Sequence, residues 1–316
     1  MAYLVSDFLT LVRQYGMLPS SSANGTADAD ILRVADEELR TRITPLVVAS
    51  NQEWWVATKR TTLTAGQRSY RIPARAVGGR VRELQLKRAD GTFRNLRRLE
   101  LEESYNLAQD STGEPELFWV KGETVNVWPK PASTGGYLQF DFLARPGRLT
   151  STSPTNLAIT TITEIGSNQV ELATTSAVFA NGVAPVDVVR SSSGFSFVCV
   201  DLAGAAQTGP KFLVYDNNQL PDSYTQLLVG DYIFPADTSY VVPLPVELHG
   251  VFVNFTVAAI KMQMGDLQSA AAFEQRAQKL AADSLQTFQP RVDGEPRVMR
   301  NGLLWRTKNT WWQRGQ

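Results

Sequence analysis

Hydrophobic positions near both ends of the chain recur at helical spacing. In the stretch "ADADILRVADEELRTRITPLVV", apolar residues three or four positions apart form one stripe, which is typical of an amphipathic helix. The pair Thr44-Pro45 predicts either one bent helix or two consecutive helices. Similar stripes run through 248–262 and 273–288, separated by a C-cap and N-cap signal at Gly265-Asp266. Because an amphipathic helix cannot bury its stripe alone, we expect the N- and C-terminal helices to pack on each other.

Between these helical ends the period of the apolar positions changes to two. From about residue 66 to 148 the alternation predicts antiparallel sheet, with hairpin turns at Asp90-Gly91 and Lys121-Gly122. Residues 150–160 are rich in Ser, Thr and Pro, which is typical of a boundary. Beyond them, short alternating runs at about ten-residue spacing continue to about 242 and predict a small β-sandwich or barrel.

The predicted fold class is therefore α+β. We expect a helical bundle made by the N- and C-terminal helices, an antiparallel β-sheet, an inserted small β-sandwich or barrel, and an extended C-terminal arm. In terms of domains, residues 1–149 with 243–290 form the core, 150–242 the inserted module, and 291–316 the arm.

Charge and composition narrow the functional classes. The 316 residues hold 31 basic and 31 acidic side chains, so the molecule as a whole lacks the excess positive charge of a nucleic-acid binder. With one cysteine and one histidine, an internal disulfide and a structural zinc site are excluded, and we expect no cofactor. The N-terminus lacks a signal-peptide pattern, and no apolar run is long enough to cross a membrane. We expect a soluble protein made in the cytoplasm.

Candidate catalytic residues are sparse. His249 has no second imidazole or thiol to share a metal, and we interpret it as an ordinary packed or surface residue. Cys199 lies in an apolar strand and reads as a small buried hydrophobe. Four acids are interpreted as solvated, although a carboxylate pair of a hydrolase stays as a third-ranked alternative: Glu102, Glu103, Glu114 and Glu116. The glycines of 76–80 and 112–115 do not form a phosphate cradle. We therefore expect no enzyme.

Tryptophans mark two places. We place Trp54-Trp55 at the end of the long N-terminal helical stretch, with core packing favoured over an interface. The arm is different, because it interleaves tryptophans with cations: Arg297, Arg300, Trp305, Arg306, Lys308, Trp311 and Trp312. These residue types dominate protein hot spots. Stacking on nucleic-acid bases and an idle terminus stay open as alternatives.

Several stretches together resemble the head-to-tail connector (adaptor) proteins of tailed bacteriophages. They are "LPSSSANGTADADILRVADEELRTRITPLVV", "YRIPARAVGGRVRELQL", "FWVKGETVNVWPKP", "YLQFDFLARPGRL" and "AAIKMQMGDLQSAAAFEQRAQKLAADSL". The resemblance covers about 1–149 and 243–290. It implies a ring, usually of twelve subunits, docked under the portal protein in the virion neck. Its partners would be the portal, neighbouring copies and tail or nozzle components, and DNA would pass through the channel without sequence-specific binding. In similar proteins the C-terminal arm reaches the portal or a neighbouring subunit.

The resulting hypothesis is assembly rather than catalysis, with the seven arm residues named above as partner-binding anchors. The insert at 150–242 is larger than in the shorter connectors that the chain resembles. The second-ranked hypothesis therefore makes the chain another phage tail or host-attachment protein, in which 150–242 is the binding surface.

Overall fold

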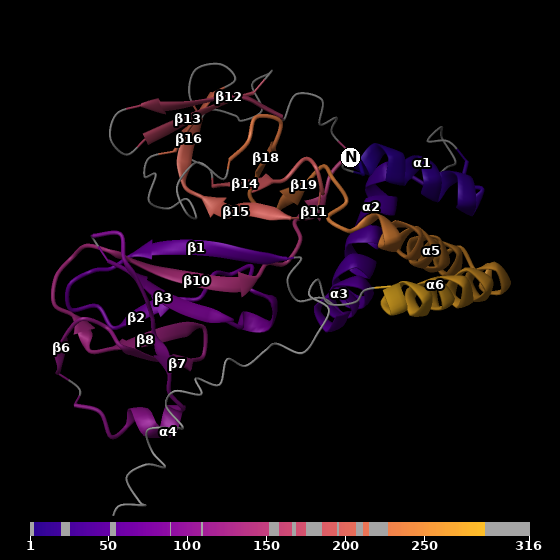
Figure 1. The fold of residues 1–316 in the computed structure, drawn as a ribbon. Coiled ribbons are helices and arrows are strands. Elements are labelled where there is room, and N and C mark those ends of the chain that lie inside the picture. The colour runs from indigo at the N-terminus through magenta and orange to yellow at the C-terminus, as the bar shows by residue number, and fades with distance from the viewer. Residues whose placement is uncertain are drawn as a thin grey trace, which may run out of the picture.

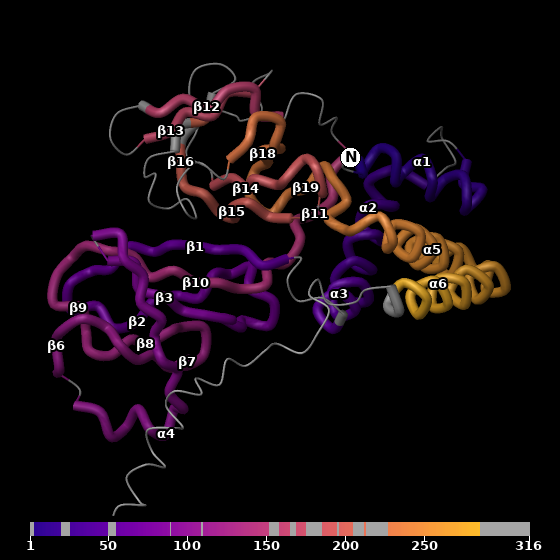
Figure 2. Tube along the Cα trace, viewed as in Figure 1, coloured from indigo at the N-terminus to yellow at the C-terminus, as the bar shows by residue number. Residues whose placement is uncertain are grey.

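The computed structural model describes most of the chain in three adjoining parts. The described residues are 3–19, 26–50, 55–88, 90–108, 110–151, 158–165, 169–174, 185–194, 196–206, 211–214 and 227–287. Figure 1 shows a helical layer on the right, a β core (residues 55–149) at the lower left, and the module (residues 150–242) above the β core. Figure 2 traces the same path, in which the chain leaves the helical layer, builds the β core and the module, and returns to the helices. The predicted α+β class is confirmed.

The helical layer joins both ends of the described chain. Its elements are α1 (Val5–Gly16), α2 (Asp28–Glu38), a π-helical turn (Leu39–Ile43), α3 (Thr44–Ser50), α5 (Val246–Gln263) and α6 (Leu267–Thr287). One hydrophobic cluster contains buried residues from α1, α2, α5 and α6. Within it the ring of Phe8 stacks on that of Phe252, with centroids 4.7 Å apart. Segments more than two hundred residues apart thus bury their apolar stripes against each other.

The backbone stays helical through Thr44-Pro45, from Asp28 to Ser50. Proline has no N–H, and its ring crowds the carbonyl four residues earlier, so it disturbs an ordinary α-helix. Here a wider π-helical turn, Leu39–Ile43, precedes it, and the Thr44 hydroxyl donates to the Leu39 carbonyl at 2.7 Å. The sequence left open one bent helix or two consecutive helices, and the structure has a single helical run, with a π-helical turn in place of a break.

The β core consists mainly of two four-stranded sheets, ordered β1-β10-β3-β4 and β2-β8-β7-β5. Its strands are β1 (Val56–Thr62), β2 (Ser69–Arg71), β3 (Glu83–Lys87), β4 (Phe93–Asn95), β5 (Arg97–Arg98), β6 (Thr112–Gly113), β7 (Leu117–Lys121), β8 (Thr124–Trp128), β9 (Lys130–Pro131), β10 (Tyr137–Leu143) and β11 (Arg148–Leu149); α4 (Leu101–Ser104) lies between β5 and β6. Both predicted hairpins are confirmed, as β3–β4 and β7–β8. The expectation of antiparallel pairing throughout is wrong for β5–β7 and β6–β9, which are short parallel contacts between segments that no hairpin turn connects.

The described strands of the module form two further sheets, ordered β12-β13-β17-β16 and β15-β14-β18. They are β12 (Ile159–Ile165), β13 (Gln169–Thr174), β14 (Val186–Val189), β15 (Phe197–Leu202), β16 (Gly204–Ala206), β17 (Lys211–Val214), β18 (Tyr232–Pro235) and β19 (Thr238–Ser239). Residues of both sheets contribute to one hydrophobic cluster. Within the described residues neither sheet closes into a barrel.

Backbone pairing ties the module to both other parts. Strand β19 pairs in parallel with β11 of the β core. At Gly147 a side chain would not fit, because a Cβ atom there would lie 2.8 Å from the Thr238 backbone. The N–H of Val242 donates to the Tyr3 carbonyl at 2.8 Å, and Leu4 bridges Val241, which connects the module's last residues to the start of α1.

The placement of Trp55 corrects one expectation. It lies after the helix, in a turn directly before β1, and not on a helix end. Its side chain is 1% exposed, and its indole N–H donates to the Pro243 carbonyl at 3.0 Å. The preference for core packing is therefore confirmed for Trp55, but the helical placement is wrong, because the helix ends at Ser50. Trp54 lies outside the described residues.

Candidate interaction surfaces

The seven arm residues predicted to bind a partner all lie outside the described residues: Arg297, Arg300, Trp305, Arg306, Lys308, Trp311 and Trp312. Their role stays a prediction. The part of the chain that the structure does describe offers other surfaces, which are built up below from the residues that form them.

The candidate catalytic residues take structural places. His249 lies in the first turn of α5, where its ring stacks on Tyr3 with centroids 4.2 Å apart and its Nε2 contacts the Leu244 carbonyl at 2.8 Å. Burial lowers the pKa of His249, which favours the neutral ring. Cys199 is buried in β15, and burial raises its pKa, which disfavours the reactive thiolate. Both interpretations as packed side chains are confirmed.

The four candidate acids are exposed, as interpreted. Glu103 accepts a hydrogen bond from the Glu100 N–H at 3.3 Å and completes a capping box at the start of α4. Glu114 pairs with Arg88 at 2.6 Å, and Glu116 pairs with Arg94 at 3.1 Å. Among the described residues, no group of three or more His, Cys, Asp or Glu side chains is arranged to hold a metal ion.

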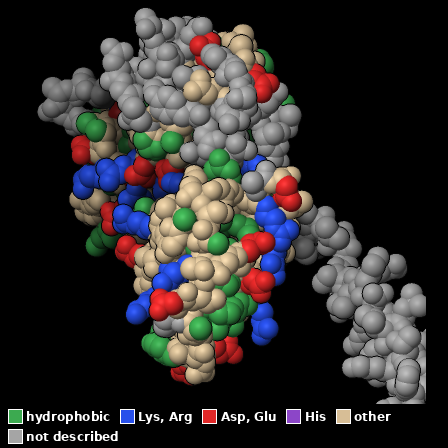
Figure 3. Space-filling view, turned by 90° about the vertical axis from the view of Figure 1, so that its left-hand side faces the viewer, with side chains coloured by type: hydrophobic (Ala, Val, Ile, Leu, Met, Phe, Trp, Pro, Cys, Tyr) green, Lys and Arg blue, Asp and Glu red, His purple; other side chains and the backbone are tan. Residues whose placement is uncertain are grey.

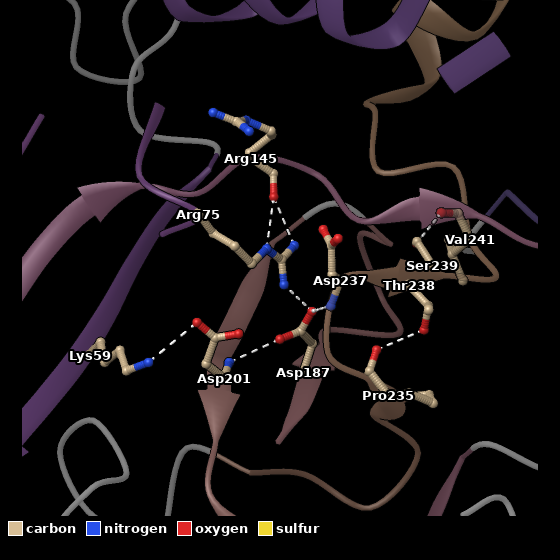
Figure 4. Close-up of polar contacts among 10 residues, drawn as sticks. All are labelled: Lys59, Arg75, Arg145, Asp187, Asp201, Pro235, Asp237, Thr238, Ser239 and Val241. Atoms are coloured by element: carbon tan, nitrogen blue, oxygen red, sulfur yellow. Dashed lines mark hydrogen bonds and ion pairs between the residues drawn. The ribbon is translucent and has the colours of Figure 1, made fainter. Parts of the chain in front are cut away.

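A polar junction joins the β core to the module (Figure 4). The buried guanidinium of Arg75 donates to the Asp187 carboxylate and, through Nε and Nη2, to the Arg145 carbonyl at 3.1 and 2.7 Å. Asp187 also accepts hydrogen bonds from the N–H groups of Asp201 and Asp237, at 2.9 and 3.3 Å. Five donor contacts therefore converge on one buried carboxylate and one carbonyl, which fixes how the module sits on the β core.

Two further contacts frame this junction. Lys59 of β1 pairs with Asp201 of β15 at 3.3 Å. The Arg75 guanidinium lies 5.5 Å from the centroid of the Phe197 ring, and Phe197 packs against the clusters of both the helical layer and the β core. Burial raises the pKa of Asp187, while the charge of Arg75 and the Asp201 N–H act to lower it.

An exposed group of arginines surrounds the turn between β2 and β3. We name Arg71, Arg80, Arg82 and Arg145 the arginine rim. Arg71 and Arg145 line an open hollow of about 430 Å³, and Arg80 and Arg82 line a neighbouring one of about 340 Å³. The two hollows share Gly78, which with Gly79 has a φ of +63°, so the turn uses a backbone conformation that other residues rarely adopt.

The smaller hollow has four apolar side chains in its lining. Val48 of α3, Val77, Val81 and Leu143 line it together with Gly78 and the two arginines. Among the described residues, Arg80, Arg82 and Arg145 form no ion pair with a carboxylate. Apolar side chains beside arginines that lack a carboxylate partner among the described residues have the composition of a protein-binding hot spot. Figure 3 shows the left-hand face of the molecule, where Lys and Arg side chains alternate with Asp and Glu side chains along both edges of the β core.

Two exposed apolar groups complete the surface. Met262, Met264 and Leu267 are exposed at the turn between α5 and α6. On the module, Leu228 and Val229 are 53% and 66% exposed in the turn before β18. Exposed apolar side chains that lie close together are candidates for protein contacts.

Sequence reasoning missed the arginine rim and the polar junction. The rim draws its arginines from three separate segments, so no local run of charge reveals it. A regional charge count does contain a signal, because the β core is rich in arginine while the module is acidic. Asp187 and Arg75 are 112 residues apart, and their pairing follows only from the packing of the two parts.

The comparisons with known proteins bear on these surfaces. A model of the SU10 adaptor protein family matches residues 4–172, which is more than half of the chain. None of the curated proteins matches it. Within the described residues, no helix is both long enough and apolar enough to cross a membrane. The family match confirms the resemblance to phage head-to-tail connectors.

The match covers α1 to α3, the whole β core and the first strands of the module. The chain therefore belongs to the SU10 adaptor protein family and is a phage head–tail adaptor, a structural protein of the virion that interacts with other capsid and tail proteins.

Proposed function

We propose that the protein is the repeating subunit of a ring, of about twelve copies, that docks under the portal protein and gives the tail a platform, with DNA passing through the channel without sequence-specific binding. The observation that carries this proposal is that one copy presents two unlike faces. The helical layer ends in exposed apolar side chains at the α5–α6 turn, and the β core presents the arginine rim. A closed ring needs such heterologous contacts, in which one patch meets a different patch on the next copy.

The arm (residues 291–316) is the proposed attachment to the portal or a neighbouring copy. Its support is composition, because Trp305, Trp311 and Trp312 supply large apolar anchors. Arg297, Arg300, Arg306 and Lys308 supply donors for charge-assisted hydrogen bonds to acids and carbonyls. In the proposed mechanism, neighbouring subunits bury surface against each other and so build the ring wall, and the arm anchors that ring to the portal.

The test is the mass of the species formed with the portal protein. Wild-type protein mixed with portal is expected to form a complex far heavier than portal alone. The variant Trp305→Ala/Trp311→Ala/Trp312→Ala is expected to stay folded, with the same thermal midpoint, and to lose that complex. A matched control, Tyr105→Ala, removes one exposed aromatic ring from the end of α4 and is expected to bind portal normally.

Normal portal binding by the arm variant would remove the arm from the mechanism while leaving the ring untouched. Failure of the wild-type protein to bind portal under any salt condition would contradict the docking proposal itself.

A second candidate function keeps the virion location but assigns the working surface to the module. The observation in its favour is the exposed pair Leu228 and Val229 on a turn that lies beyond the family match. Deleting 150–242 is a poor test, because Phe197 and Val200 of the module pack against the other clusters. The better test is Leu228→Ser/Val229→Ser. Loss of host-cell attachment by particles with normal heads and tails would favour this function, and unchanged attachment would exclude that surface.

A further inference from the structure

The arginine rim has almost no acidic partner inside one copy. Among the described residues, Arg71 is the one member with a carboxylate at ion-pair distance, Glu123 at 3.5 Å, and both side chains are more than three-quarters exposed. A pair so exposed contributes little free energy and is easily exchanged for another partner. Guanidinium groups bind carboxylates through paired, directional hydrogen bonds. The rim is therefore suited to carboxylates that come from outside the copy.

The smaller hollow adds apolar surface to these cations. Its lining includes four half-buried apolar side chains, Val48, Val77, Val81 and Leu143. A partner that covers them gains apolar burial in addition to the charge contacts. A partner that fits must therefore carry carboxylates next to an apolar side chain.

The turn around α4 carries that combination on its surface. We name Glu100, Leu101, Glu102 and Glu103 the acidic tip, and all four residues are exposed. Glu100 and Glu103 form the capping box of α4 through backbone N–H groups, and these contacts involve no cation. Among the described residues, no cation forms an ion pair with any of the three carboxylates. The tip therefore offers the negative charge that the rim lacks.

The rim and the acidic tip lie at opposite ends of the β7–β8 hairpin. At one end, the turn residues Gly122 and Glu123 line the larger hollow of the rim. At the other end, the indole N–H of Trp128 donates to the carbonyl of Ala108, just after α4, at 2.9 Å. Figure 1 shows α4 at the lower end of the β core, on the side away from the module. Two unlike patches at opposite ends of one body are what a head-to-tail contact between copies needs.

The exposed apolar group at the α5–α6 turn fits the rim less well. Met262, Met264 and Leu267 supply apolar surface there, but the turn has a single carboxylate, Asp266. That carboxylate already pairs with Lys261 at 3.7 Å. Arginines covered by such a surface would lose water without gaining carboxylates, which costs free energy.

We propose that the acidic tip of one copy docks in the arginine rim of the next copy, so that the subunits join head to tail. This inference rests on the proposed function, because it assigns a lateral contact of that ring. Charge complementarity carries it, with the three carboxylates of the tip against the guanidinium groups and Leu101 against the apolar lining of the hollow. A contact of one rim with another would instead bring like charges together.

Two variants remove one patch each. Arg80→Glu/Arg82→Glu lowers the net charge of the four rim residues from +4 to zero. Glu102→Lys/Glu103→Gln changes the net charge of the tip from −3 to zero. In the second variant the glutamine amide keeps an acceptor for the Glu100 N–H, so the capping box of α4 is preserved.

The experiment measures the mass of the full-length protein, without portal, at about 0.05 M and about 0.5 M salt, where screening is weak and strong respectively. Wild-type protein is expected to form species larger than a dimer of the 34.9 kDa chain at low salt and to dissociate at high salt. The rim variant and the tip variant are each expected to stay monomeric at both salt concentrations, because each lacks one of the two patches.

Mixing the two variants gives the decisive result. The intact tip of the rim variant fits the intact rim of the tip variant, whereas their two altered patches carry no net charge. An equimolar mixture is therefore expected to form a dimer of twice 34.9 kDa and nothing larger. A substitution that had merely damaged the fold would not regain association on mixing.

Two controls separate the patches from net charge and from shape. Arg97→Glu/Arg98→Glu changes the net charge as much as the rim variant does, but at exposed positions directly before the tip in the chain. Added negative charge there should strengthen the contact, so its large species are expected to survive a higher salt concentration than those of the wild type. Tyr105→Ala removes an exposed ring beside the tip without changing its charge and is expected to keep the large species.

Several results would overturn the inference. They are a wild-type protein that stays monomeric or stops at a dimer at low salt, large species formed by either patch variant alone, and a mixture that contains only monomer. If the tip variant assembles while Met262→Ser/Leu267→Ser does not, the α5–α6 turn makes the contact instead. If the rim variant assembles but no longer retards a DNA duplex that the wild type retards, the rim serves nucleic acid.

Portal binding is scored separately. A tip variant that still forms rings on portal contradicts this inference alone, whereas wild-type protein that never binds portal contradicts the proposed function.

Discussion

The helical layer and the polar junction hold distant segments together in opposite ways. In the helical layer, α1 and α5 meet through an apolar cluster that includes the stacked rings of Phe8 and Phe252. At the junction, the β core meets the module through Arg75 and Asp187, with Lys59 and Asp201 beside them. Apolar burial supplies free energy without fixing direction, whereas a buried ion pair supplies little net free energy but strongly penalises any arrangement that separates its partners. The helical layer therefore accounts for stability, and the junction accounts for orientation.

The largest expected effect comes from the helical layer. Phe252→Ala removes a fully buried ring and leaves a cavity between α1 and α5, so we expect the free energy of unfolding to fall by about 4 kcal/mol. Urea unfolding followed by circular dichroism measures it. The control is Val246→Ala on the same helix, where the side chain is 72% exposed and the expected change is within about 0.5 kcal/mol. Equal effects of the two variants would mean that the α1–α5 contact does not carry stability.

The junction is expected to follow, with a diagnostic double variant. Arg75→Met leaves the Asp187 carboxylate buried without its cation and should cost about 3 kcal/mol. Replacing both partners, as Arg75→Met/Asp187→Leu, should recover most of that loss, since no buried charge is left unpaired. The recovery is measured by the same unfolding curves. A double variant as unstable as the single one would show that the other hydrogen bonds of Asp187 matter more than its charge.

The contributions of these two regions to the free energy of unfolding are also expected to change with pH in opposite directions. Burial lowers the pKa of His249, so the helical layer should lose stability as the pH falls below the ordinary histidine value of about 6.5. Burial raises the pKa of Asp187, so its contribution is favourable at low pH and is lost as the pH rises through its folded pKa. His249→Gln should flatten the acid loss, and the cost of Arg75→Met should be smaller at pH 5 than at pH 8. Unfolding midpoints across that range measure both.

The smallest expected effect is that of the outer pair of the junction. Lys59→Met breaks the 3.3 Å contact with Asp201. The side chain of Lys59 is 33% exposed and that of Asp201 is 19% exposed, so we expect the free energy of unfolding to fall by about 0.5 kcal/mol. Arg71→Met, whose pair with Glu123 is far more exposed, serves as the control and should change stability still less. A loss from Lys59→Met as large as that from Arg75→Met would show that the junction acts as one network rather than through its buried pair.

Local sequence patterns predicted much of this fold, because turns, helix ends and amphipathic stripes are formed by residues close together in the chain. The hairpin turns at Asp90-Gly91 and Lys121-Gly122, the break between α5 and α6 at Gly265, and the amphipathic stripes depend on residues within a few positions of one another. The predicted placement of Trp55 on a helix end was wrong because the local sequence determines the end of a helix only weakly. The contact that holds its indole, the hydrogen bond to the Pro243 carbonyl, comes from a residue 188 positions away. The seven predicted arm residues lie outside the described structure, so composition remains their only support.

The sequence by itself determined the α+β class, most of the helices and hairpins, and the likeness to phage adaptors, since periodicity, turn chemistry and motif order are properties of short stretches. Only the tertiary structure decided that Arg75 meets Asp187 and that four arginines from three separate segments surround one turn. Such contacts join residues far apart in the chain, so they form only when whole sheets and helices pack. Burial of apolar surface selects that packing, and the polar groups that it buries must then find hydrogen-bond partners.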